Sequence, residues 1–125
     1  MTRVVVDASA MAAVVFQEPA FEDVVRELEG ATVYAPTLLK FELANVAVIK
    51  ARRHPTRAAQ IFTALALALD DGSDLVWRDV DASDVALLAV ATKTTAYDAS
   101  YLWLAGTLGA DLVTLDRRLA AASRG

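Results

Sequence analysis

The sequence contains no cysteine, only one histidine, and five glycines that are scattered along the chain. Without cysteine, disulfides and thiolate metal sites are both excluded. The single histidine, His54, precedes Pro55 at an expected helix end, where we interpret it as a surface or capping residue, and this disfavours histidine-based acid–base chemistry. No GxxxxGK[ST] pattern is present, so there is no phosphate-binding loop of that kind.

The sequence also lacks long apolar runs, although it is not short of apolar residues. No run approaches the ~18 residues of a membrane-spanning helix, and Asp7 interrupts the apolar start that a signal peptide would need. We therefore expect a cytoplasmic protein. With 125 residues, 56% of them hydrophobic, residues 1–125 should form a single domain with a substantial core. The net charge of −4 argues against coating nucleic acid by bulk charge, but not against binding it through a metal.

Short β-branched or apolar runs alternate with segments that carry helix signals. Strands are predicted at 3–6, 32–35, 75–80 and 111–115. Helices are predicted at 10–16, 21–28, 38–53, 56–69 and 84–93, with a further one that starts near Asp98 and a last one at 117–123. This alternation predicts an α/β fold with a mostly parallel sheet and helices on its faces.

Three aspartates stand where expected helices begin. Asp7 follows the first strand, Asp116 follows the last, and Asp98 lies three residues after Thr95, which is close to a capping box. Taken singly, each is first of all explained as helix capping. Carboxylates just beyond the strand ends of an open α/β sheet also lie where ligands bind, and a helix N-terminus favours a carboxylate in either role.

Glu42 differs because it lies inside the 38–53 helix. Its helical neighbours Leu38, Val46 and Ile49 are apolar, so an unpaired carboxylate there would be costly. The charge requires a cation, either an arginine or a metal, and Arg53 is about three turns away. We therefore favour a metal-linked or catalytic role over a plain salt bridge. Together the four acids predict an oxygen-rich site suited to Mg²⁺ or Mn²⁺.

Three segments and their spacing resemble a known family. VVVDAS at 4–9, PTLLKFELANV at 36–46 and TAYDASYLWLAGTLGADLVTLDRRL at 95–119 resemble the PIN domain, specifically the small ribonuclease toxins of VapBC toxin–antitoxin pairs. The resemblance covers essentially the whole chain and depends on the ordered set Asp7, Glu42, Asp98 and Asp116. It implies a three-layer α/β/α fold whose mostly parallel sheet has four to five strands.

The resemblance also implies an activity. It suggests a Mg²⁺- or Mn²⁺-dependent endoribonuclease, a hydrolase that is inhibited by a cognate antitoxin and forms a homodimer. The four acids would be the catalytic and metal-binding residues, with Ser9 and Asn45 lining the site. The cation would lower the pKa of a bound water and stabilise charge on the phosphoryl oxygens. Attack by water, as in the family, would leave a 5′-phosphate and a 3′-hydroxyl.

Two other classes remain open. A receiver-type phosphoacceptor domain also clusters acids at strand ends, but it would need a second acid beside Asp7, where Val6 and Ala8 stand. It would also need a lysine directly after a late strand, and none follows Val80 directly. A catalytically inactive binding module of the same fold is disfavoured only by the presence of all four acids, and a metal titration would distinguish it.

Two surfaces are candidates for binding partners. Basic residues are densest at Lys50, Arg52, Arg53, His54 and Arg57. This run is either a solvated helix end or a surface that binds an RNA backbone, with Arg52 and Arg53 as the contacting residues. The helices at 10–16 and 21–28 carry apolar residues that should mostly be core: Met11, Val14, Val15, Phe16 and Phe21. By resemblance, part of that surface should form a groove for an antitoxin segment.

Overall fold

The computed structural model describes residues 2–125, and its four strands form one parallel sheet. The strands are β1 (Thr2–Val6), β2 (Ala31–Pro36), β3 (Leu75–Arg78) and β4 (Asp111–Val113), in the order β3-β2-β1-β4. Val4 of β1 lies opposite Val33 on one side and Asp111 on the other. The predicted parallel α/β sheet is confirmed, with the smaller of the expected strand numbers.

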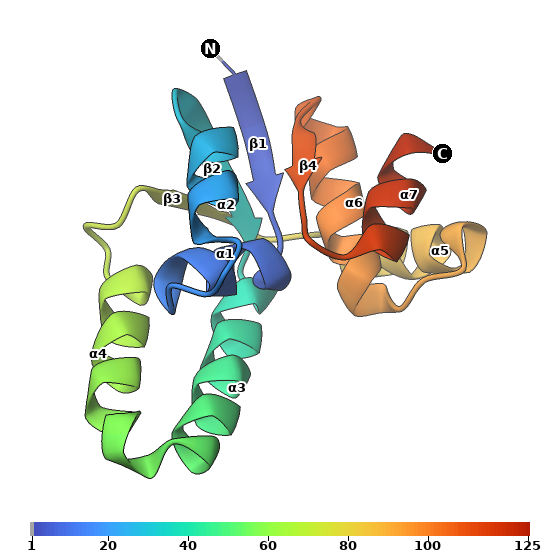
Figure 1. Cartoon of the computed structure of the whole chain (residues 1–125). Helices are drawn as coiled ribbons and strands as arrows, with labels where there is room; N and C mark the ends of the chain where they lie inside the picture. The colour runs from blue at the N-terminus through green and yellow to red at the C-terminus, as the bar shows by residue number, and fades with distance from the viewer. Residues whose placement is uncertain (1) are drawn as a thin grey trace.

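Helices cover both faces of this sheet. They are α1 (Ala8–Val15), α2 (Phe21–Leu28), α3 (Leu38–Arg53), α4 (Ala58–Leu69), α5 (Ala82–Thr92), α6 (Ala96–Leu108) and α7 (Arg117–Arg124), with a 3₁₀ turn η1 (Pro55–Arg57) before α4. α1 packs with α2, α3 and α4, whereas α6 lies against β1 and β2 and packs with α5 and α7. Figure 1 shows α3 and α4 side by side as a hairpin that extends beyond the sheet. This is the expected three-layer arrangement.

The core lies where β1 meets the helices of both layers. Val4, Val5 and Val6 are buried because β1 is a central strand with helices on both faces. Leu39 and Leu43 of α3 and Tyr101 of α6 pack into the same cluster. The helices that carry Glu42 and Asp98 are therefore fixed to the sheet by their buried faces.

Most differences from the expected boundaries have local causes. The helix expected at 10–16 begins at Ala8, directly after the capping residue Asp7. The strand expected at 111–115 ends at Val113, because Thr114 turns toward Asp7. The strand expected at 75–80 ends at Arg78, and the helix expected at 56–69 is divided into η1 and α4. None of the helices within residues 2–125 combines the length and apolarity needed to cross a bilayer.

Candidate active site

Asp7 stands immediately after β1 and is only 5% exposed. Its Oδ1 accepts hydrogen bonds from the backbone N of Ala10 at 3.0 Å and from Ser9 Oγ at 2.7 Å. Its Oδ2 accepts one from Thr114 Oγ1 at 2.5 Å. Asp7 is therefore an N-cap, as the sequence suggested, and at the same time a carboxylate held in one orientation by three donors.

Thr114 and Asp116 bring the turn after β4 to the same place. Besides donating to Asp7, Thr114 Oγ1 accepts a hydrogen bond from the backbone N of Asp116 at 3.0 Å. Asp116 caps α7, where its Oδ1 accepts from the backbone N of Arg118 at 2.9 Å and of Leu119 at 3.3 Å. Asp116 is exposed, whereas Asp7 is buried. The two aspartates therefore form the inner and outer parts of one acidic surface.

Glu42 is half-buried on α3, and its partner is a neutral phenol. The Tyr101 hydroxyl, from α6, donates a hydrogen bond to Glu42 Oε1. Within residues 2–125 no lysine or arginine forms an ion pair with Glu42, so of the two expected partners the metal stays a prediction, and the partner within the protein is a phenol. The face around it is also less buried than expected, since Ile49 is 41% exposed.

Asp98 lies in the first turn of α6 and is half-buried. The cap of α6 is Thr95, whose Oγ1 accepts a hydrogen bond from the backbone N of Asp98 at 3.1 Å. Within residues 2–125 no hydrogen-bond donor and no cation contacts the Asp98 carboxylate. Unlike Asp7 and Asp116, Asp98 is therefore not occupied with capping, and its oxygens remain free for a ligand.

The four acids are close enough to influence one another. Burial raises the pKa of Glu42 above its usual value, and the charges of Asp98 and Asp7 raise it further, while the Tyr101 hydrogen bond opposes the shift. Burial also raises the pKa of Asp98, with added repulsion from Asp116 and Asp7. Burial and the Glu42 carboxylate raise the pKa of Tyr101, which keeps it a hydrogen-bond donor at neutral pH. Four acids far apart in sequence thus form one electrostatic cluster.

The cluster has the chemistry of a metal site without a preformed cage. Within the described part of the chain, no three acidic or histidine side chains are placed to hold a metal ion together. Oxygens of Asp7 and Glu42 are engaged by the hydroxyls of Ser9, Thr114 and Tyr101. The donors are nevertheless all oxygen, which fits Mg²⁺ or Mn²⁺, and a cation would relieve the mutual repulsion.

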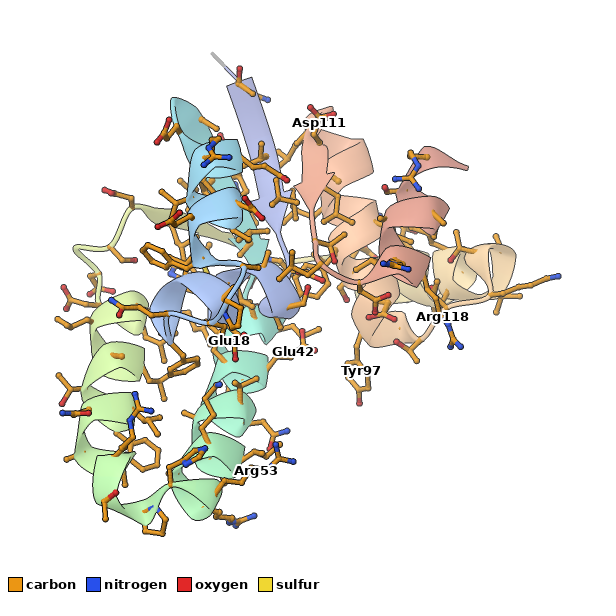
Figure 2. All side chains as sticks on the ribbon, in the orientation of Figure 1. Glu18, Glu42, Arg53, Tyr97, Asp111 and Arg118 are labelled. Carbon is orange, nitrogen blue, oxygen red and sulfur yellow. The ribbon has the colours of Figure 1, made fainter. Side chains whose placement is uncertain are left out.

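The remaining residues expected at the site are only partly brought together. Ser9 contacts Asp7, and its Oγ accepts a hydrogen bond from the backbone N of Leu115 at 2.9 Å. Asn45 is exposed and shares a hollow with Glu42. Arg52 and Arg53 are exposed at the far end of α3, and Figure 2 shows Arg53 well away from Glu42.

The basic run is shorter than the sequence suggested. Lys50 Nζ lies 2.6 Å from Glu18 Oε2 in a half-buried ion pair, so it is not a free cation. His54 is exposed at the C-cap of α3, as expected of a surface or capping residue. The candidate contacts for RNA in this region are therefore the exposed Arg52, Arg53 and Arg57.

Sequence reasoning missed Tyr101 and Thr114. Tyr101 lies three residues after Asp98, so the two are on one face of α6, and this spacing was the available signal. Thr114 lies two residues before Asp116, where a hydroxyl can accept the backbone N–H at the helix start. Both residues hold the acids in position and neither is itself acidic.

The fold and the cluster define a class: a parallel α/β domain with a cluster of acidic side chains at the carboxyl edge of its sheet. A family model described as "PIN domain" matches residues 4–125, and the chain belongs to this family. It is 32% identical to Ribonuclease VapC3 of Pyrobaculum aerophilum over 127 residues, covering 94% of this chain and 92% of that protein.

A solved structure agrees with this membership. The crystal structure of PAE2754 from Pyrobaculum aerophilum superposes with a TM-score of 0.80 at 28% identity, covering 99% of this chain and 87% of the other. The resemblance stated from the sequence motifs is thus confirmed at the level of family and fold. A receiver-type domain is set aside, because the whole chain matches a different family.

Proposed function

We propose that this protein is a divalent-metal-dependent endoribonuclease, the toxin of a toxin–antitoxin pair, and that it hydrolyses phosphodiester bonds in RNA. One observation carries the proposal: four carboxylates gather at the carboxyl edge of the sheet, namely Asp7, Glu42, Asp98 and Asp116. Burial raises the pKa of Glu42 and of Asp98 there, and the neighbouring charges of the cluster raise both further. Membership of the PIN-domain family and the likeness to a protein named Ribonuclease VapC3 support it.

We assign the binding of Mg²⁺ or Mn²⁺ to these four acids. When bound, the cation would supply an acidified water and would stabilise charge on the phosphoryl oxygens. Ser9 and Thr114 keep the Asp7 carboxylate oriented, and Tyr101 does the same for Glu42. Asp98 has no donor on its carboxylate within residues 2–125, so it can turn toward a cation without breaking a hydrogen bond.

A cleavage assay on single-stranded RNA tests the proposal, with Asp98→Asn as the main variant. This change keeps the shape and removes only charge, because Asp98 neither caps a helix nor accepts a hydrogen bond. Asp111→Asn is the control: Asp111 is an exposed aspartate at the start of β4, and Figure 2 shows it far from Glu42.

We expect cleavage by the parent and by Asp111→Asn with Mg²⁺ or Mn²⁺, no cleavage in excess EDTA, and a loss of at least about 100-fold in Asp98→Asn. Undiminished cleavage in EDTA or by Asp98→Asn would overturn the assignment. RNA binding without cleavage under any metal condition would instead favour the inactive binding module.

The proposal extends to partners and assembly. The apolar residues expected on the first two helices are all half-buried, namely Met11, Val14, Val15, Phe16 and Phe21. Val15 and Phe16 line a hollow of about 350 Å³ with Ile61, Lys50 and Arg57. We propose that this hollow receives an apolar antitoxin segment that carries acidic residues.

We also propose that residues 1–125 act as one cytoplasmic domain in a homodimer. Co-expression with the antitoxin and sedimentation of the complex test both points.

A further inference from the structure

A second hollow, of about 350 Å³, lies between α3 and the start of α6, directly beside the acid cluster. Its lining comprises Ala8, Leu38, Phe41, Glu42, Asn45, Val46 and Tyr97. Phe41 is 74% exposed and Tyr97 is 64% exposed, although both are aromatic. Figure 2 shows Tyr97 projecting from the start of α6 on the side where α3 carries Glu42.

The exposure of these two rings has an energetic cost. Burial of an aromatic side chain stabilises the folded state, and rings that stay in water forgo that stabilisation. The fold leaves both rings in water on two different helices that line one hollow. Glu42 is also the only charged side chain among the seven lining residues, so the hollow offers nothing cationic to a phosphate group.

The chemistry of the hollow matches an unpaired nucleobase. Aromatic faces stack well on the flat rings of bases, and they do so in single-strand binders regardless of sequence. Asn45 adds an amide that can both donate and accept, as a base edge requires. Its side chain makes no hydrogen bond within residues 2–125, so its donors and acceptor are free.

We propose that this hollow is a nucleobase subsite, in which a base adjoining the scissile phosphodiester stacks on Phe41 or Tyr97 and is contacted at its edge by Asn45. The inference rests on the proposed ribonuclease function, because Glu42 belongs to both the hollow and the acid cluster. Phe41 and Tyr97 are then positioning residues for the substrate, and Asn45 determines which base is preferred.

The test measures binding without cleavage. The probe is a short single-stranded RNA that contains 2-aminopurine, a fluorescent base analogue, in metal-free buffer. The variants are Phe41→Ala, Tyr97→Ala and Tyr97→Phe, which keeps the ring. Leu87→Ala and Val90→Ala are matched controls, since these apolar residues of α5 are 73% and 81% exposed but lie outside the hollow.

We expect quenching of 2-aminopurine by the parent, by Tyr97→Phe and by both α5 controls. The two alanine variants should bind about tenfold more weakly and quench less, which is the size of effect that loss of one base–aromatic stack has. In cleavage assays their KM should rise about tenfold while kcat stays within about twofold of the parent. An RNA with an abasic nucleotide should bind the parent as weakly as the intact RNA binds the variants.

Three results would overturn the subsite. The first is that both alanine variants quench the probe as strongly as the parent, and the second is that the parent binds the abasic and intact RNAs equally well. The third is that either alanine change converts a dimer to a monomer while RNA affinity stays unchanged. The last would make the hollow an interface between copies of this chain. Failure of the proposed function is distinguishable, because a parent that quenches the probe but never cleaves RNA supports the subsite and overturns only the nuclease assignment.

Discussion

The hydrogen bond from Tyr101 to Glu42 should be measurable as stability, because it joins a buried phenol to a half-buried carboxylate. A hydrogen bond to a charged group contributes about 1.5–3 kcal/mol net, and partial exposure of Glu42 places this one at the lower end. Tyr101→Phe should therefore destabilise the protein by about 1.5 kcal/mol. For a chain of this length, that lowers Tm by about 6 °C.

Urea unfolding in metal-free buffer at pH 7 is the assay, run as a double-mutant cycle with Glu42→Leu. Each single change leaves one partner without its hydrogen bond, whereas the double change removes both partners. The double variant should therefore lose about 1 kcal/mol less than the sum of the single losses. Strict additivity, to within about 0.3 kcal/mol, would refute the idea that the two side chains stabilise each other.

Three further predictions concern charge. Asp116→Asn keeps the helix cap, and Glu42→Gln keeps the hydrogen-bond acceptor for Tyr101. Without metal, the Tm of both variants should therefore equal that of the parent or lie slightly above it. Mg²⁺ should raise the Tm of the parent much more than theirs, and equal shifts would show that these acids do not bind it. The pKa of Asp98 is raised above 3.8, so the folded state holds more protons than the unfolded state just above that pH. The contribution of Asp98 to the free energy of unfolding should thus fall as the pH rises just above 3.8. In urea unfolding at several pH values, the free energy of unfolding of Asp98→Asn should fall less than that of the parent. Replacing Arg52 and Arg53 together by alanine should raise KM more than it lowers kcat, and it should reduce the salt slope of RNA binding by about 1.4. Unchanged kinetics would show that the two arginines form only a solvated helix end and do not contact RNA.

The sequence alone predicted the elements and the acids because both depend on local patterns. The bounds of α2 and α3 follow from helical periodicity and from the breaks at Gly30 and His54-Pro55. Asp7 and Asp116 were found because a carboxylate at a helix start is a local signal. Boundaries were less accurate at 113–115, where the strand ends because Thr114 bonds to a residue far away in the chain.

What tertiary structure decided is how the acids are held and what lies beside them. Thr114 meets Asp7 across 107 positions, and Tyr101 meets Glu42 across 59, because β1 pairs with β4 in the sheet and α6 packs against β1. Packing brings a phenol, Tyr101, to Glu42 and an acid, Glu18, to Lys50, and the sequence reasoning had expected neither partner. Pairing of strands and contact between helices depend on the order of the whole sheet, which no local spacing encodes.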